Sequence, residues 1–198
     1  MTWAQAAVIA ALVLFQSEIR ALFFRVRYPK RRRFIRRIPR AEIAEEIVDA
    51  VDRLSRAGHG AIIAIQQEMS LEDYADSGTE LLANVSSDLL VTLFTPYTPL
   101  HDGAVIIRDV VLVGAGCILP LSQAIFADRM LGTRHRAAVG LSEATDALVI
   151  VVSEENASIS VAYKGHLHRG LTTLELRDIL NGQMPRDAAD RIPAETIR

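Results

Sequence analysis

Three short apolar runs constrain the fold of this chain more than any other feature of its sequence. Residues 60–66, 104–119 and 147–153 read GAIIAIQ, AVIIRDVVLVGAGCIL and ALVIVVS. Runs of this length and composition are typical of strands buried in a sheet. Amphipathic helical patterns lie between and around them. Helices and strands therefore alternate along the chain, and we predict an α/β (α+β) fold: a single globular domain with a central mixed β-sheet surrounded by helices.

The boundaries of the remaining elements follow from periodicity and from turn residues. Ile43, Ile47, Val51 and Leu54 recur at helical spacing after residue 41. We predict helices at 41–57, at 85–94 with Ser86 or Ser87 as N-cap, from about residue 134, and at 172–182 with Thr172 as N-cap and Gly182 as the stop. We expect strands at 104–109 and 110–119 to pair across a tight turn, and 158–163 to pair with 147–153. Residues 70–78 are polar and end in a turn glycine, 95–103 form a loop, and the polar tail 182–198 is expected to be disordered.

The front of the chain carries a membrane signal. Residues 3–15 are apolar except for Gln5, and residues 20–40 hold ten Lys or Arg and no acid. A helix of that apolar length is about 20 Å long, whereas a full span needs about 20 residues. Two interpretations stay open: the recorded start is late and falls inside a last membrane helix, or the segment is a short interfacial anchor.

We therefore predict a partial transmembrane or interfacial helix at 1–19 and a basic juxtamembrane linker at 20–40. An apolar run followed by arginines is the order expected at the cytoplasmic end of a membrane helix, and the arginines favour an anionic membrane surface. Binding of nucleic acid is the weaker interpretation, because no known nucleic-acid module accompanies the basic run.

Four polar clusters are candidates for chemistry. In the first, His101 and Asp102 precede Gly103 and Ala104, whose small size lets a backbone approach a ligand closely. The alternative interpretation of this cluster is that Asp102 is an ordinary turn residue. The second cluster is Thr133-Arg134-His135-Arg136 at a predicted helix start, where unpaired backbone N–H groups and arginines suit phosphate. The alternative is a charged surface turn, although cations are unfavourable at that end of a helix dipole unless an anion is present.

The other two clusters follow predicted strands. Ser153-Glu154-Glu155 could hold a hard cation such as Mg²⁺ or Mn²⁺, and the alternative is a solvated turn. Residues 119–122 read LPLS; backbone groups near Leu119 could hold a flat base, and the alternative is a plain strand end. The one cysteine, Cys117, has apolar neighbours and is expected to be a core residue.

Together these clusters offer carboxylates for a metal, arginines for phosphates and small residues for close approach. Phosphoryl or nucleotidyl transfer needs that combination, because its catalysis consists mostly of positioning and charge neutralisation. The sequence has neither G-x-x-x-x-G-K-[ST] nor G-x-G-x-x-G. The residues alone thus indicate an anion and metal site suited to nucleotides, of neither P-loop nor Rossmann type.

The order of three segments carries a resemblance to a known family. PLHDGAVII (99–107), LGTRHRAAVGLSE (131–143) and VVSEE (151–155) resemble the diadenylate cyclase domain, whose hallmarks are a DGA and an RHR motif. The resemblance covers roughly residues 41–181. FQSEIR (15–20) after an apolar run is similar to the membrane-anchored class, in which several transmembrane helices precede the domain. This chain holds at most part of one such helix.

The resemblance implies an enzyme that joins two ATP molecules into the second messenger cyclic di-AMP and releases two pyrophosphates. Each subunit of a face-to-face homodimer would bind one ATP, so that each 3′-hydroxyl attacks the α-phosphate of the facing nucleotide. A membrane regulator and a phosphoglucosamine mutase are implied as partners, and the cell membrane, with the catalytic domain cytoplasmic, as the location. The alternative function is a non-catalytic adenine-nucleotide sensor.

The resemblance also implies a role for each site residue. The implied metal ligands, for Mg²⁺ or Mn²⁺, are Asp102, which helps to activate the 3′-hydroxyl, Glu154 or Glu155, and His101. The implied phosphate-binding residues are Thr133, Arg134, His135, Arg136 and Ser153, and the residues lining the nucleotide are Gly103, Ala104 and, through its backbone, Leu119.

Overall fold

The computed structural model describes residues 40–123 and 132–182, and all of these belong to one compact unit. The predicted segment 1–19, the linker up to residue 39 and the tail from residue 183 lie outside the described residues. No helix in the described ranges is both long enough and apolar enough to span a bilayer.

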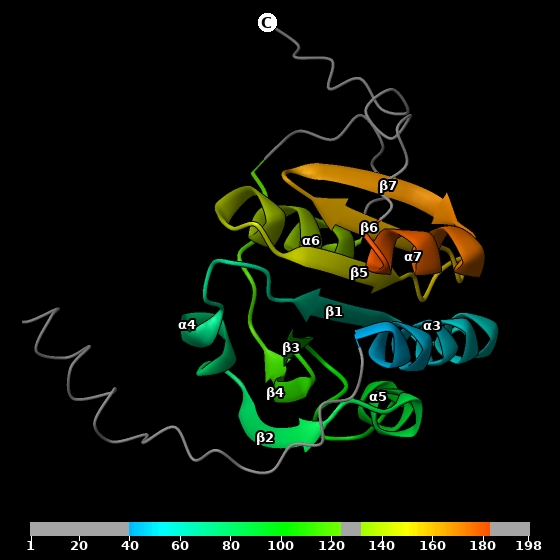
Figure 1. The fold of residues 1–198 in the computed structure, drawn as a ribbon, viewed down its shortest axis with the longest axis horizontal. Helices are drawn as coiled ribbons and strands as arrows, with labels where there is room; N and C mark the ends of the chain where they lie inside the picture. Colours follow the sequence, from blue (N-terminus) through cyan, green and yellow to red (C-terminus); the bar gives the residue numbers. More distant parts are fainter. Residues whose placement is uncertain (1–39, 124–131, 183–198) are drawn as a thin grey trace, which may run out of the picture. The chain divides into compact units, whose positions relative to one another are not determined.

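One mixed sheet of seven strands forms the centre of the domain, in the order β2-β4-β3-β1-β5-β6-β7 (Figure 1). β1 pairs in parallel with β3, and every other pairing is antiparallel. The strands are β1 (Ala61–Ile65), β2 (Thr79–Asn84), β3 (Ala104–Arg108), β4 (Val111–Cys117), β5 (Leu148–Val152), β6 (Ile159–Tyr163) and β7 (His166–Leu171). The predicted α/β class and central mixed sheet are confirmed.

Helices cover both faces of this sheet. α3 (Arg40–Ala57), α5 (Ser87–Phe94) and α7 (Thr173–Leu180) pack on one face, with α3 lying against both of the others. α6 (Thr133–Ala144) and the single-turn α4 (Glu72–Ala75) pack on the opposite face. Because both faces are buried, the central strands are apolar at every position instead of alternating. Ile63 of β1 therefore packs under α3 and α5, whereas its neighbours Ile62 and Ala64 pack under α6.

The helix starts confirm the predicted caps. The Ser86 hydroxyl accepts a hydrogen bond from the Leu89 amide at 3.3 Å. Thr172 and Glu175 form a reciprocal capping box at the start of α7. Each cap satisfies amides that have no partner within the first turn of a helix.

Two strands were not predicted from the sequence, and both are edge strands. β2 (TELLAN) and β7 (HLHRGL) each pair with one neighbour, and most of their side chains are at least partly exposed. An edge strand has less apolar surface to bury, so it lacks the apolar run that marked the central strands. The polar stretch 70–78 also contains α4, which the sequence analysis did not predict.

Candidate functional site

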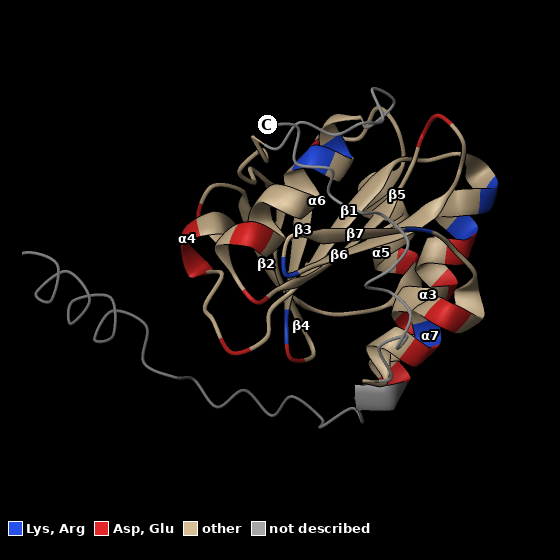
Figure 2. Ribbon diagram, turned by 90° about the horizontal axis from the view of Figure 1, so that it is seen from above, with Lys and Arg blue, Asp and Glu red and all other residues tan. Residues whose placement is uncertain are grey.

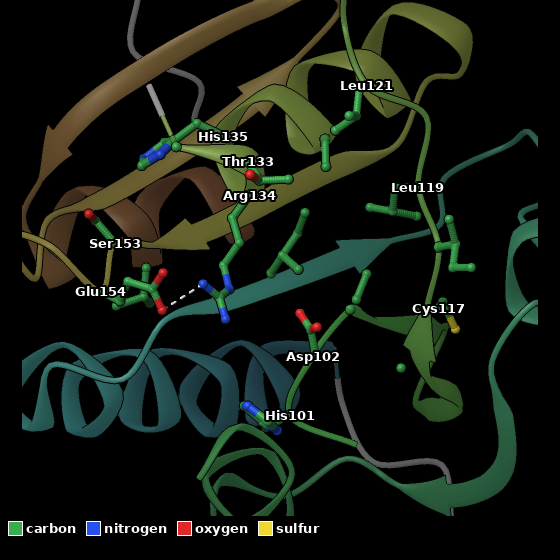
Figure 3. Close-up of a pocket in the computed structure, with 18 of the residues that line it drawn as sticks. His101, Asp102, Cys117, Leu119, Leu121, Thr133, Arg134, His135, Ser153 and Glu154 are labelled. Carbon is green, nitrogen blue, oxygen red and sulfur yellow. Dashed lines mark ion pairs between the residues drawn. The ribbon is translucent and has the colours of Figure 1, made fainter. Parts of the chain in front are cut away.

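A cavity of about 770 Å³ opens where β1, β3, β4 and β5 meet the start of α6. Every predicted site residue except Arg136 lines this cavity. The residues come from four places along the chain: the loop before β3, the segment after β4, the start of α6 and the turn after β5 (Figure 3). The structure therefore brings together clusters that the sequence separates by up to about fifty positions.

The HDGA turn is shaped by a close approach between two backbones. Gly103 has φ +108°, and a Cβ there would lie 2.7 Å from the carbonyl carbon of Gly116 on the neighbouring strand β4. No other residue fits both the conformation and the space. This packing places the carboxylate of Asp102, which is exposed, in the cavity.

His101 is held by its own loop. Its Nδ1 atom lies 2.6 Å from the carbonyl oxygen of Thr98. A carbonyl oxygen only accepts hydrogen bonds, so Nδ1 is the protonated nitrogen, and the Nε2 atom of the neutral ring carries the lone pair. A backbone carbonyl that fixes one imidazole nitrogen in this way is a common arrangement behind a metal-binding histidine.

The start of α6 is electrostatically suited to an anion. Its N-cap residue is Gly132, which has no side chain to cap the helix, and its first turn contains no acid. The Gly132 carbonyl accepts from the amides of His135 and Arg136, at 3.1 and 3.2 Å. The preceding amides have no partner within the helix. Basic residues gather at this end of α6, whereas acidic residues dominate α3 (Figure 2). A phosphate would satisfy both the amides and the helix dipole.

Arg134 extends from this helix start into the cavity. Its Nη1 atom lies 2.8 Å from Oε2 of Glu154, and the two side chains are 22% and 60% exposed. Figure 3 shows the guanidinium in front of β1, between Glu154 on one side and Asp102 on the other. Because Glu154 is largely solvated, a phosphate oxygen could replace its carboxylate at Arg134 at little cost.

Arg136 is the predicted site residue that the cavity excludes. It is exposed, its backbone carbonyl accepts from the Ser122 amide at 3.0 Å, and its Nη2 atom lies 3.5 Å from the Ser122 carbonyl oxygen. Residues two positions apart on a helix point to nearly opposite sides. Arg134 and Arg136 therefore cannot both face the cavity, while His135, between them, is buried in its wall.

The turn after β5 presents Glu154 on a rigid frame. The Ser153 amide donates to the Ser158 carbonyl at 3.0 Å, and the Ser153 hydroxyl accepts from the Glu155 amide at 3.3 Å. Ser55 of α3 donates its hydroxyl to the Ala157 carbonyl at 2.6 Å, which ties the turn to the opposite layer. The carboxylates thus start from a fixed backbone and not from a loose loop.

An apolar wall completes the cavity, and the sequence analysis found only part of it. Leu119 is buried, whereas Ile118 and Leu121 are 73% and 41% exposed. Large apolar side chains left open beside a polar cradle are suited to a flat base. Leu121 lay within the LPLS stretch that the sequence analysis noted, but no pattern marked Ile118.

Cys117 lines the same wall but is not a nucleophile. Burial raises the pKa of its thiol to about 11. At neutral pH it is therefore a protonated thiol, whereas the thiolate is the reactive form. The prediction of a structural cysteine is confirmed.

The described residues contain no group of three or more His, Cys, Asp or Glu side chains placed to hold a metal ion. Asp102, Glu154, Glu155 and His101 line the cavity from different loops, so a metal there could take only one or two of them as ligands and would need the rest from the substrate. Mg²⁺ commonly binds in this way, through one or two carboxylates and substrate phosphates.

Comparison with known proteins gives this site a family. Residues 48–167 match the family model described as DAC, DisA bacterial checkpoint controller nucleotide-binding. The chain is 40% identical over 188 residues to the cyclic di-AMP synthase CdaA of Bacillus subtilis, an alignment that covers 92% of this chain and 68% of that protein. The chain belongs to the diadenylate cyclase family.

Further similar proteins agree with this chain in sequence or in fold. A diadenylate cyclase of Listeria monocytogenes is 41% identical over 183 residues, which cover 91% of this chain and 66% of that protein. The crystal structure of a double mutant of DacA from Staphylococcus aureus superposes with a TM-score of 0.70 at 38% identity, covering 72% of this chain and 95% of that one. A hypothetical membrane spanning protein from Bacillus cereus superposes with a TM-score of 0.64 at 44% identity, covering 66% and 64% of the two chains.

Proposed function

We propose that this chain condenses two ATP molecules into cyclic di-AMP and releases two pyrophosphates, with a divalent metal, at the face-to-face interface of a homodimer. The observation that carries the proposal is one cavity that joins the HDGA turn, the α6 start with Arg134 and the Ser153–Glu155 turn. Its volume of about 770 Å³ suits one nucleotide.

The triphosphate would lie against the start of α6. The amides of its first turn, the Thr133 hydroxyl and the Arg134 guanidinium are all donors on this wall of the cavity. Ser153 would add a contact from the turn after β5. Arg134 would exchange the Glu154 carboxylate for phosphate oxygens and so stabilise the negative charge that develops on the departing pyrophosphate.

The adenine would lie against the opposite, apolar wall. Ile118 and Leu121 offer exposed apolar surface there, and the backbone of Leu119 offers polar groups that can recognise a base edge. Gly103 and Ala104 line the cavity at the start of β3, where the sugar and phosphates would approach. The ribose is thereby directed towards Asp102.

In the proposed reaction each ribose 3′-oxygen forms a bond to the α-phosphorus of the facing ATP. The bond from that phosphorus to the pyrophosphate breaks, the pyrophosphate leaves with the bonding electron pair, and the proton of the hydroxyl passes to water. Asp102 would orient the attacking hydroxyl from the HDGA turn. Positioning of this kind accounts for a large part of the rate in phosphoryl transfer.

A divalent cation fits the acidic side of the cavity. One or two of its side chains, Asp102 and either Glu154 or Glu155, with the Nε2 atom of His101 as an alternative ligand, would hold it together with substrate phosphates; Mg²⁺ and Mn²⁺ both suit such a site. When bound, the cation would lower the pKa of a coordinated hydroxyl and neutralise phosphate charge.

A second subunit would supply the second ATP. A cavity of about 770 Å³ suits one nucleotide, which supports a reaction between the sites of two copies of the chain. The membrane-anchoring segments predicted at 1–19 and 20–40 would keep such copies on one surface, with the catalytic domain on the cytoplasmic side where ATP is found. The resemblance in fold to a protein described as membrane spanning supports this location.

Pyrophosphate release tests the reaction. The full chain is incubated with ATP and Mg²⁺ or Mn²⁺, and pyrophosphate and consumed ATP are quantified. We expect one pyrophosphate for each ATP consumed, a rate per subunit that rises with protein concentration, and no release after chelation. Tight ATP binding without pyrophosphate release under any of these conditions would instead support the nucleotide sensor.

A further inference from the structure

Gly60 is the residue immediately before β1, and its backbone conformation does not require a glycine. Its φ lies outside the left-handed region, so an alanine could adopt the same conformation. A Cβ at this position would, however, lie 2.8 Å from Cζ and 2.9 Å from Nη1 of Arg134. Carbon–carbon contacts need about 3.5 Å or more. The Arg134 guanidinium therefore packs directly on the bare Cα of Gly60.

The sheet fixes Gly60 in relation to the other partner of Arg134. Ala61 pairs with Val152 in the antiparallel register of β1 and β5. Gly60 thus lies beside the end of β5, where the chain continues into Ser153 and Glu154. The guanidinium rests on Gly60, and its Nη1 atom meets Glu154 at 2.8 Å. The start of β1 and the end of β5, which pair in one sheet, together define where the guanidinium of Arg134 lies.

We propose that Gly60 is a positioning residue for Arg134: the missing side chain leaves the space in which the guanidinium lies flat over the start of β1 and faces the cavity. The inference rests on the proposed function, in which Arg134 holds the triphosphate. A methyl group at residue 60 displaces the guanidinium and leaves the fold intact, because the atoms it meets are the far end of a flexible side chain.

A double-mutant cycle measures this coupling. The variants are Gly60→Ala, Arg134→Ala and the double variant in the full chain, and the readout is kcat/KM for cyclic di-AMP formation. A displacement of about 1 Å at a catalytic group costs up to about 100-fold, so we expect a loss of roughly 10- to 100-fold for Gly60→Ala. The double variant is expected to be no slower than Arg134→Ala alone, because the guanidinium is then already absent.

Gly58→Ala provides a matched control in the same short connection between α3 and β1. Gly58 has φ +69° and nothing within 4 Å of its Cβ position, so alanine there strains the backbone without touching Arg134. We expect it to lower the thermal unfolding midpoint and to leave kcat/KM nearly unchanged. Gly60→Ala is expected to do the reverse. Losses at Gly60 and Arg134 that multiply in the double variant would overturn the proposal, as would a fall in the midpoint for Gly60→Ala that Arg134→Ala does not restore.

A second readout is independent of turnover. The Nε–Hε resonance of Arg134, assigned by its loss in Arg134→Lys, reports the surroundings of the guanidinium by NMR. We expect Gly60→Ala to shift this resonance and Gly58→Ala to leave it in place; an unshifted resonance would overturn the inference. If the unmutated chain makes no cyclic di-AMP, the proposed function fails, but the NMR comparison still decides whether Gly60 positions Arg134.

Discussion

Replacing Arg134 by alanine should weaken ATP binding and leave the free energy of unfolding almost unchanged. In the free protein the ion pair that Arg134 forms with Glu154 is largely solvated on the glutamate side. Such a pair contributes about 0 to 1 kcal/mol, so unfolding should change little. In the ATP complex the same guanidinium would donate a charge-assisted hydrogen bond that contributes about 1.5 to 3 kcal/mol. At about 1.4 kcal/mol per factor of ten, we expect ATP to bind roughly 10- to 150-fold more weakly.

Isothermal titration calorimetry with ATP in chelator measures the affinity, and chemical denaturation measures the free energy of unfolding. Arg53→Ala is the matched control, because Arg53 forms exposed ion pairs with Asp49 and Asp88 on α3 and α5 and does not line the cavity. Arg136→Ala is the sharper comparison, since it removes the same charge two positions away on the same helix. An unchanged affinity for Arg134→Ala, or an equal loss for Arg136→Ala, would refute the assignment of the phosphates to the cavity face of α6.

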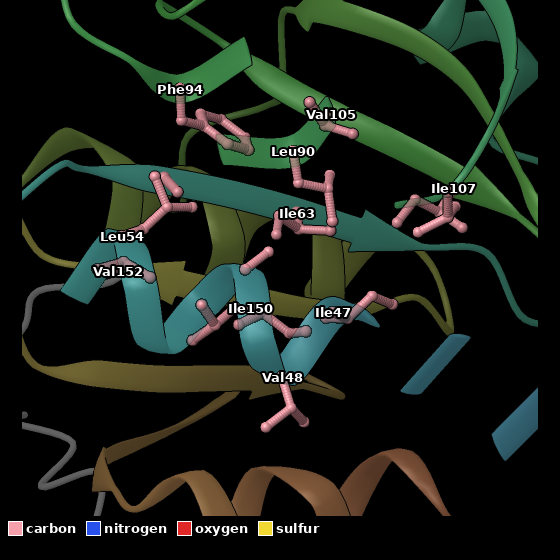
Figure 4. Close-up of a cluster of buried hydrophobic side chains, with 14 of the residues drawn as sticks. Ile47, Val48, Leu54, Ile63, Leu90, Phe94, Val105, Ile107, Ile150 and Val152 are labelled. Atoms are coloured by element: carbon pink, nitrogen blue, oxygen red, sulfur yellow. The ribbon is translucent and has the colours of Figure 1, made fainter. Parts of the chain in front are cut away.

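Further predictions concern the fold around the site. Thr172→Ala removes the capping box of α7 and should lower the free energy of unfolding by about 1 kcal/mol, measured in urea, whereas Thr172→Ser should keep most of it. Ile63→Ala opens a hole between the sheet and α3 and should cost about 2 to 5 kcal/mol in the same assay (Figure 4). Cys117 should react slowly with a thiol reagent at pH 8 until urea unfolds the chain, because burial raises its pKa to about 11; fast reaction in the native state would contradict this. Burial, and then the positive charge of His166, lower the pKa of His168 below its ordinary value of 6.5. The folded state therefore loses stability as the pH falls through and below 6.5, and His168→Asn should reduce the stability difference between pH 7 and pH 5.

The buried half of the fold could be predicted because burial leaves a strong sequence pattern. β1, β3 and β5 are apolar on both faces, and α3 carries its apolar residues at helical spacing, so each was found close to its observed bounds. The caps Ser86 and Thr172 were found for a similar reason, since hydroxyls at helix starts satisfy amides that lack partners.

The edges of the sheet could not be predicted in this way. β2 contains a register shift between Glu80 and Ala83, with Leu82 at φ +50° and 47% exposed, so its side chains do not follow a simple alternation. β7 is set by its pairing with β6, a contact between segments that propensity alone does not specify.

In the site, the sequence predicted which residue types take part but not how all of them are oriented. The residue types at Asp102, Arg134 and Glu154 indicated a site for a metal and for phosphates, and the structure gathers these side chains around one cavity. The sequence did not show that Arg136 points away, because that depends on the rotation of α6 against its neighbours. Nor did it show the role of Gly60, because the contact with Arg134 joins residues far apart in the chain.

The proposed reaction of this cavity is the conversion of ATP into cyclic di-AMP. The most direct test is mass spectrometry of the products after the full chain is incubated with ATP and Mg²⁺ or Mn²⁺, beside an Asp102→Asn variant that is shown to be folded. We expect a cyclic di-AMP peak from the unmutated chain and a peak reduced by orders of magnitude from the variant. An equal peak from Asp102→Asn would contradict the role of the HDGA turn, and no peak from folded protein that binds ATP would contradict the proposed reaction itself.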